Sequence, residues 1–290
     1  MFKKTSLFFI LLIIAFVITA CGTKDLTKGK TAEEIIAGSY EKMAEVENYD
    51  MDLEMNMKMQ LPDQNPFDIT MQGKATIFQK PLMMKMVMDM NDPQTGNPIN
   101  MEQYMEQGEE GINVYQKVED QWFKMSINDP ALAEMMNMDP TKNIDLFLDN
   151  LKEAKVLGEE KVGEQETVQI ELVASSAIYD ELMQQMPGLN MNQPNLSFGP
   201  EVLSKMGDMK YIIWVDKTTL NMVKTSMDLT ENIRNLGQAL TGSEQLPPEL
   251  AEMFGGMEMS ASYEINNLNG AEQIVIPEEA KNAQEMPLSN

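Results

Sequence analysis

The sequence has no histidine and only one cysteine, Cys21, among 290 residues. Without histidine, the commonest proton shuttle and metal ligand of proteins is missing. A single thiol cannot form an intramolecular disulfide or a cysteine-based zinc site. Aromatic residues are also scarce, at 7% of the chain. These absences exclude the usual acid–base, thiol and zinc chemistry, so we expect no catalytic residues and a fold stabilised by its apolar core alone.

Positive charge is scarce as well. The chain has 22 lysines and arginines against 46 aspartates and glutamates, which gives a formal net charge of -24. Nucleic acids and anionic membrane surfaces carry charge of the same sign, so they repel such a chain. We therefore expect no nucleic-acid partner, and any attachment to a membrane needs another device.

The N-terminus supplies such a device. Lys3 and Lys4 precede an apolar run, Leu7 to Ile18, of about 12 residues, which suits a secretory signal and falls short of the ~20 residues of a membrane span. Two small residues then precede Cys21. This pattern resembles the cleavage site of bacterial lipoproteins and predicts a signal peptide over residues 1–20 and a diacylglyceryl group on Cys21. The alternative is a secreted protein with a stray cysteine near the cleavage site.

Methionine is abundant, with 29 residues. Burying a methionine contributes about 1.5–3 kcal/mol, but ordering its three side-chain torsions costs nearly 1.5–2 kcal/mol, so it fills a rigid core inefficiently. Its advantage is that an unbranched, polarizable side chain adapts to irregular apolar shapes. From Tyr49 onward, methionines recur at every second position, as on one face of a half-buried strand.

Hydrophobic periodicity predicts an α+β fold. A capping box at Thr31 and Glu34 opens a helix over Ala32 to Glu47. Period-two segments predict strands at Met51–Gln60, Phe67–Ile77, Met84–Met90, Met101–Gln107, Gly111–Val118, Gln121–Ile127, Lys155–Lys161, Thr167–Val173, Tyr211–Asp216, Val223–Leu229 and Met257–Ile265, with an edge segment at Ile274–Pro277. Further helices are expected at Ala131–Met136, Ile144–Leu151, Ser175–Met186, Pro200–Met206, Ile233–Leu240 and Glu249–Phe254.

Consecutive strands joined by short polar turns favour an antiparallel meander within one domain. We expect a signal peptide over residues 1–20, a flexible tether over 21–31, a single domain over 32–277 and a loose polar tail over 278–290.

The order of these elements, with Tyr211–Leu220 as a strand and turn and Val275–Ala280 near the end, resembles the LolA and LppX/LprG lipid-carrier lipoproteins. The resemblance spans most of residues 31–280. It implies a strongly curved antiparallel sheet, or incomplete barrel, with helices packed across its concave face and an apolar interior for acyl chains. With a lipid anchor at Cys21, we expect a position on the outer face of the bacterial cytoplasmic membrane.

Three interpretations of the methionines remain open. They can fill the core of a structural or sensory lipoprotein that acts through an envelope protein partner. They can form a soft Cu(I) site, since Met55, Met57 and Met59 share one strand face at about 6.8 Å spacing and thioethers select Cu(I). They can also line a pocket for a lipid or another apolar ligand, the interpretation adopted here, with no cofactor or resident metal. Its candidate residues are Met55, Met57, Met59, Met71, Ile77, Met84, Met86, Met88, Met227 and Met259.

Overall fold

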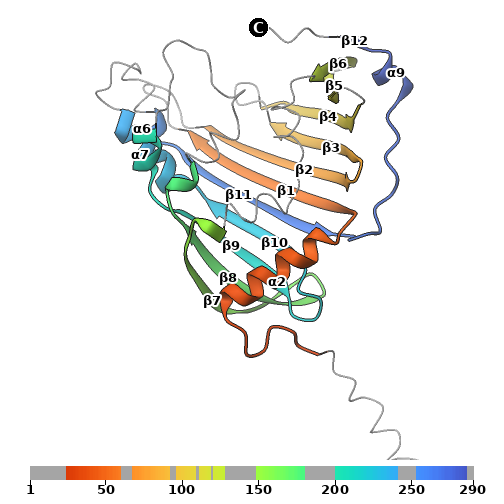
Figure 1. Cartoon of the computed structure of the whole chain (residues 1–290). Coiled ribbons are helices and arrows are strands. Elements are labelled where there is room, and N and C mark those ends of the chain that lie inside the picture. The colour runs from red at the N-terminus through yellow and green to blue at the C-terminus, as the bar shows by residue number, and fades with distance from the viewer. Residues whose placement is uncertain are drawn as a thin grey trace, which may run out of the picture.

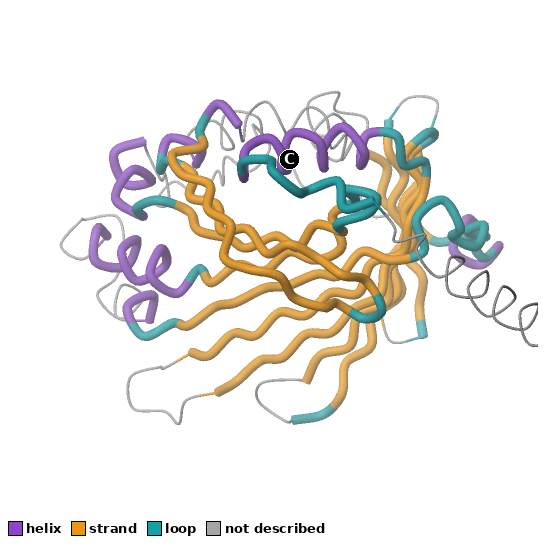
Figure 2. Tube along the Cα trace, turned by 90° about the horizontal axis from the view of Figure 1, so that it is seen from below, coloured by secondary structure: helices purple, strands orange, loops and turns teal. Residues whose placement is uncertain are grey.

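A computed structural model describes residues 24–59, 67–91, 96–108, 111–118, 120–127, 148–179, 200–240 and 253–285. These residues form an α+β fold around a twelve-stranded sheet, which Figures 1 and 2 show to be twisted and curved. All its pairs are antiparallel except the last, between β12 and β6. The sheet stays open, with β12 at one edge and β7 at the other.

Two antiparallel meanders build this sheet. The first contains β1 (Asn48–Met59), β2 (Phe67–Gln79), β3 (Leu82–Asn91), β4 (Pro98–Gln107), β5 (Ile112–Val118) and β6 (Gln121–Ile127). The second contains β7 (Leu151–Val162), β8 (Gln165–Ala174), β9 (Met209–Asp216), β10 (Met222–Asp228) and β11 (Glu258–Asn266). The strand order is β12-β6-β5-β4-β3-β2-β1-β11-β10-β9-β8-β7. The first and last long strands, β1 and β11, therefore pair and join the two meanders.

The first helix, α2 (Ala32–Ala44), begins at the predicted capping box. The Glu34 backbone N–H donates to Thr31 Oγ1 at 3.3 Å, and the Thr31 N–H donates to Glu34 Oε2 at 2.9 Å. The helix ends three residues before the expected Glu47. Figure 1 shows α2 lying across the second meander, where its fully buried Ile36 packs in one core cluster with Ile170 of β8 and Ile213 of β9.

The expected flexible tether is wrong for residues 24–30, which dock on the turn between β9 and β10. The Leu26 N–H donates to the carbonyl oxygen of Lys217 at 2.7 Å, and the Leu26 side chain packs against the main core. Thr27 is only 8% exposed. Nothing in the local pattern signals this contact, because the segment is polar and its partners lie almost 200 residues away.

The C-terminal segment also departs from expectation. Ile274–Pro277 pairs with no described strand; instead, Ile274 and Ile276 are buried against Tyr104 of β4 and Tyr115 of β5, while Val275 between them is 77% exposed. An extended chain lying over a sheet therefore shows the same period of two as a strand. The loose tail is wrong for residues 278–285, which form α9 (Glu278–Lys281) and β12 (Gln284–Glu285).

The remaining helices are short. Pro200–Met206 is helical as predicted, as α6 (Pro200–Leu203) and the 3-10 helix η2 (Ser204–Met206), and α7 covers Thr230–Leu240. The helix expected to reach Leu151 is wrong at that residue, because Leu151 starts β7 and pairs with Ala174. Residues 177–179 and 253–255 are helical. The helix expected at Ala131–Met136 and residues 180–186 of the expected helix Ser175–Met186 lie outside the described residues, whereas Ser175 and Ser176 are described and are not helical. Within the described ranges, no helix combines the length and apolar character needed to cross a bilayer.

Candidate functional site

The register separates the two faces of the sheet. Met55 of β1 pairs with Met71 of β2 and Ala261 of β11, and Met71 pairs in turn with Met90 of β3. We call the side that carries these residues the methionine face. One position along each strand, Glu54, Gln72, Asp89 and Ser262 lie on the opposite side, which we call the polar face. Because side chains alternate along a strand, this division extends across the whole sheet.

All ten candidate residues lie on the methionine face. Directly paired neighbours among them and their strand partners fix this placement: Met57 with Met259, Met84 with Ile77, Met86 with Ala75, Met88 with Gly73, and Met227 with Ala261. The strand alternation read from the sequence therefore assembles into one surface.

The ten residues differ in exposure. Ile77 and Met84 are buried in a second core cluster with Met105 and Val114, so they pack the sheet and cannot touch a ligand without rearrangement. The other eight, namely Met55, Met57, Met59, Met71, Met86, Met88, Met227 and Met259, are partly exposed. These eight come from β1, β2, β3, β10 and β11, which are neighbours in the sheet.

The structure adds residues to this surface. Met90 pairs with Met71, and Met101 of β4 pairs with Met88, and both are partly exposed. The same alternation that marks Met86 and Met88 could have identified Met90. Gly73 sits among them without a side chain, and a Cβ there would lie 3.1 Å from Met88 Cγ. The sequence gives no signal for this last feature, because it depends on the pairing of β2 with β3.

Four tyrosines lie beside the methionines. Tyr211 of β9 pairs with Met227, Tyr263 of β11 pairs with Leu53, and Tyr40 of α2 is hydrogen-bonded to Tyr211. Burial, with Tyr263 nearby, raises the pKa of both Tyr40 and Tyr49 to about 12. Burial, and then the proximity of Tyr40, raises the pKa of Tyr211 further. All four hydroxyls are therefore neutral at physiological pH, and each can donate or accept a hydrogen bond.

Strand geometry brings the Cβ atoms of these methionines closer across strands than along one strand. Met55, Met71 and Met90 form a direct row over three adjacent strands. Directly opposed Cβ atoms in an antiparallel pair are about 4.5–5.5 Å apart, against about 6.8 Å for alternate residues such as Met55 and Met57. The row is therefore a better candidate for shared thioether contacts than the three methionines of β1.

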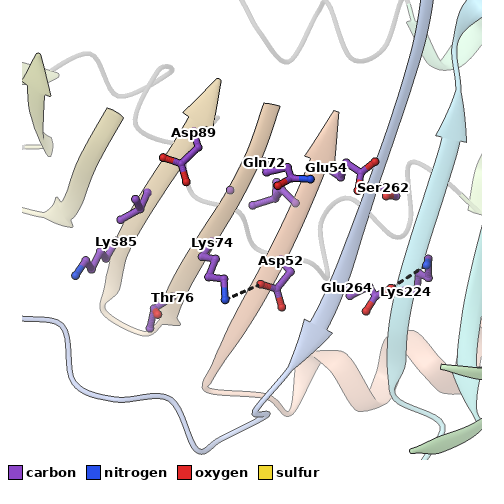
Figure 3. A pocket seen from close by; sticks show the side chains of 13 residues that line it. Asp52, Glu54, Gln72, Lys74, Thr76, Lys85, Asp89, Lys224, Ser262 and Glu264 are labelled. Atoms are coloured by element: carbon purple, nitrogen blue, oxygen red, sulfur yellow. Dashed lines mark hydrogen bonds and ion pairs between the residues drawn. The ribbon is translucent and has the colours of Figure 1, made fainter. Parts of the chain in front are cut away.

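The polar face carries a shallow hollow of about 650 Å³ between β3 and β10. Figure 3 shows its charged lining, in which Lys224 pairs with Glu264 at 2.8 Å and Lys74 with Asp52 at 3.7 Å. These side chains are partly or largely exposed, and exposed pairs contribute only about 0–1 kcal/mol each. The mixed charges already neutralise one another, so this hollow has the character of a solvated sheet surface rather than of a site selective for one ligand.

Carboxylates do not gather into a metal centre in the described part of the chain. No group of three or more aspartates, glutamates or cysteines there could hold a metal ion. The adjacent pair Glu159 and Glu160 diverges as strand geometry requires: Glu159 bonds Lys217 at 2.7 Å, whereas Glu160 accepts from Trp214 Nε1 at 2.7 Å. Both carboxylates act in structural contacts.

The chain is similar to several solved structures. LprF from Mycobacterium bovis matches with 14% identity and a TM-score of 0.48, covering 86% of this chain and 97% of its own. The lipoprotein LppX from Mycobacterium tuberculosis matches with 14% identity and a TM-score of 0.45, covering 84% and 98%. A LolA superfamily protein from Nitrosomonas europaea matches with 11% identity and a TM-score of 0.24, covering 82% and 94%. The resemblance expected from the sequence is confirmed.

Two further comparisons concern sequence. A protein-family model, DUF6612, described as a family of unknown function, matches residues 31–285. No curated protein matches the chain.

Proposed function

The chain belongs to the DUF6612 family, and we propose that it is a membrane-anchored extracytoplasmic lipoprotein that binds a lipid or another apolar molecule without catalysing a reaction. In this proposal the signal peptide is removed before Cys21, and a diacylglyceryl group on Cys21 holds the protein at the outer face of the cytoplasmic membrane. The ligand lies on the methionine face, with helices across the concave side of the sheet.

The observation that carries the proposal is the run of eight partly exposed methionines across five neighbouring strands. A static apolar core gains little from methionine, because the ~1.5–2 kcal/mol needed to order each side chain nearly cancels its burial. A lining that moulds itself to acyl chains of different shape uses the same flexibility to advantage. The neutral tyrosine hydroxyls beside Met227 are suited to hydrogen-bond an ester or carboxyl group of such a ligand.

The direct test is native mass spectrometry of protein purified from membranes, followed by titration with a fluorescent acyl probe. The double variant Met55→Gln/Met71→Gln places amides in the centre of the methionine face, and we expect it to weaken probe binding at least tenfold, which corresponds to about 1.4 kcal/mol. The matched control, Glu54→Gln/Gln72→Glu, changes the opposite face of the same two strands and conserves net charge. It should bind as the wild type does.

Absence of any co-purified apolar molecule together with absence of probe binding would refute the proposal. In that case the remaining interpretation is a structural or sensory lipoprotein that acts through an envelope protein partner, with the methionines as core filler. An equal loss of affinity in both double variants would refute the assignment of the site to the methionine face. It would not contradict the proposal that the protein binds an apolar ligand.

A second candidate function, Cu(I) binding, is favoured by the row of Met55, Met71 and Met90. Replacing Met55, Met57 and Met59 by leucine tests the strand predicted from sequence, and replacing the row by leucine tests the arrangement in the structure. Both changes roughly conserve volume, so each substitution should cost less than about 1.5 kcal/mol of stability. Unchanged competition with a Cu(I) chelator in both triple variants would remove these methionines as a copper site.

A further inference from the structure

The segment Asp25–Lys30, which we call the docked segment, is fixed to one end of the sheet. Lys217, in the turn between β9 and β10, pairs with Asp25 at 3.3 Å and with Glu159 of β7 at 2.7 Å. Asp25 also accepts from the backbone N–H of Thr27 at 2.9 Å and from its hydroxyl at 2.6 Å. Together with the hydrogen bond of the Leu26 N–H and the burial of Thr27, these contacts hold the docked segment at several points.

The turn that contacts the docked segment is itself held by hydrogen bonds. Asp216 Oδ1 accepts from the backbone N–H groups and hydroxyls of Thr218 and Thr219, at 2.7 to 3.0 Å. The Leu220 N–H closes the turn by donating to the Asp216 carbonyl at 2.9 Å. Lys217 is therefore presented in a fixed position, and its side chain is only 16% exposed.

Chain length then limits where Cys21 can be. Four Cα steps separate Cys21 from Asp25, and a fully extended chain covers at most about 14 Å in that distance. Strands of 12 residues such as β1 are about 40 Å long. The register places the start of β1 at the same end of the sheet as the β9–β10 turn, and Met57 and Met59 at the other end.

We propose that the end of the sheet formed by the β9–β10 and β7–β8 turns faces the lipid surface in which Cys21 is anchored. Met57, Met59 and Met259 then lie at the end of the sheet farther from that membrane. The inference rests on the proposed function only through the anchor at Cys21. It deepens that function, because a ligand would enter or leave the distal part of the methionine face from the side away from the anchoring membrane.

The charge of the docked segment agrees with this orientation. Three exposed lysines, Lys24, Lys28 and Lys30, lie in or beside the docked segment, which contains a single acidic residue. The whole chain, by contrast, has a net charge of -24. Each lysine near an anionic headgroup surface contributes about 1 kcal/mol of attraction. The segment that lies closest to the lipid is thus a basic part of an acidic protein.

Tryptophan fluorescence provides a test. Trp214 lies in β9 two residues from the turn, and direct pairing across the sheet places Trp122 of β6 in the same row as Trp214, so Trp122 cannot mark the far end. Lys58, which is exposed near the end of β1 that lies away from the β9–β10 turn, is the site for an introduced tryptophan. The chain from Cys21 onward contains every described residue, and its only thiol can be coupled to a maleimide phospholipid. Vesicles of phosphatidylcholine and phosphatidylglycerol that contain this lipid and a dansyl-headgroup lipid then report the distance of each tryptophan from the surface by energy transfer.

We expect strong transfer in the Trp122→Phe variant, whose remaining tryptophan is Trp214, and at least threefold weaker transfer in the Trp122→Phe/Trp214→Phe/Lys58→Trp variant, whose single tryptophan lies near the far end of β1. Because Trp214→Phe removes the hydrogen bond to Glu160, the Trp122→Phe/Lys58→Trp variant, which retains Trp214, supplies a second reading: it should show a component of emission that the membrane does not quench. Equal or reversed transfer would overturn the orientation. A flexible insertion of twenty Gly and Ser residues between Lys24 and Asp25 should abolish the difference, and its persistence would refute the role of the short connection.

Chemical coupling makes this test independent of acylation in cells. Failure of fatty-acid labelling at Cys21 would refute the proposed anchor, whereas loss of the tryptophan difference in coupled protein would refute the orientation.

Discussion

Replacing Asp216 by asparagine should destabilise the protein at neutral pH and leave its stability nearly unchanged at low pH. The carboxylate is 5% exposed, and one of its oxygens accepts four hydrogen bonds from Thr218 and Thr219. Burial alone would raise the pKa of Asp216, but these donors outweigh it and hold the pKa below the ordinary value. The charged form is therefore the one that the folded state prefers.

The magnitude follows from the difference between charged and neutral acceptors. A hydrogen bond to a charged group contributes about 1.5–3 kcal/mol and one between neutral groups about 0.5–1.5 kcal/mol. Asparagine keeps an oxygen acceptor and loses the charge, and four bonds to one oxygen do not add. We therefore expect a loss of about 1–3 kcal/mol, or a fall in Tm of about 2–4 °C for each kcal/mol in a domain of this size.

The sign of the pH dependence is set by the lowered pKa. A carboxylate whose pKa is depressed in the folded state contributes stability above its unfolded pKa of about 3.9 and loses that contribution as pH falls through the folded pKa. The difference between wild type and Asp216→Asn should thus be full at pH 7 and shrink steadily below pH 4.

The assay is urea unfolding followed by tryptophan fluorescence at several pH values. Asp89→Asn, which removes an exposed carboxylate of β3, is the control and should change stability by no more than about 0.5 kcal/mol. Equal stability of Asp216→Asn and wild type at pH 7, or a difference that persists below the folded pKa, would refute the reasoning.

Three further outcomes are expected. Cys21→Ser should abolish incorporation of a fatty-acid analogue and membrane retention while leaving the circular dichroism spectrum unchanged; equal label in wild type and variant would contradict the proposed anchor. Thr31→Ala should cost about 1 kcal/mol in thermal unfolding, because it removes the N-cap of α2, whereas Thr31→Ser should cost much less. Ultraviolet titration should show Tyr40, Tyr49 and Tyr179 ionising near pH 12, and because their folded pKa is raised by burial, stability should be full below pH 10 and fall above it; tyrosines that all titrate near 10 would show that they are exposed.

The strands and the first helix could be predicted because their signals are local. Alternation along residues 51–59 reflects one half-buried and one more exposed face, and the hydroxyl of Thr31 lies within reach of the Glu34 N–H whatever the rest of the chain does. The ten candidate residues share one face for the same reason: methionines alternate with polar residues along these strands, and pairing aligns the sides that carry the methionines.

The contacts that sequence could not supply join distant residues. Asp25 and Lys217 are ordinary charged residues until the fold brings them within 3.3 Å. The burial of Ile274 and Ile276 on the polar face depends on an apolar patch made by Tyr104 and Tyr115 of neighbouring strands. Tyr40 lies in α2, and its hydrogen-bond partner Tyr211 lies in β9. Local periodicity contains no information on such pairs.

The pairing of β1 with β11 has a consequence for biogenesis. These strands form nine directly paired positions, from Asp50 with Asn266 to Lys58 with Glu258, across about 200 intervening residues. Until residue 266 has been synthesised, β1 presents an unpaired edge, and the sheet exists at most as two separate meanders. Completion of the fold therefore waits for nearly the whole polypeptide to emerge. Truncation before β11 should leave the edges of β1 and β10 exposed and prone to aggregation. The last long strand therefore completes the sheet by covering both edges.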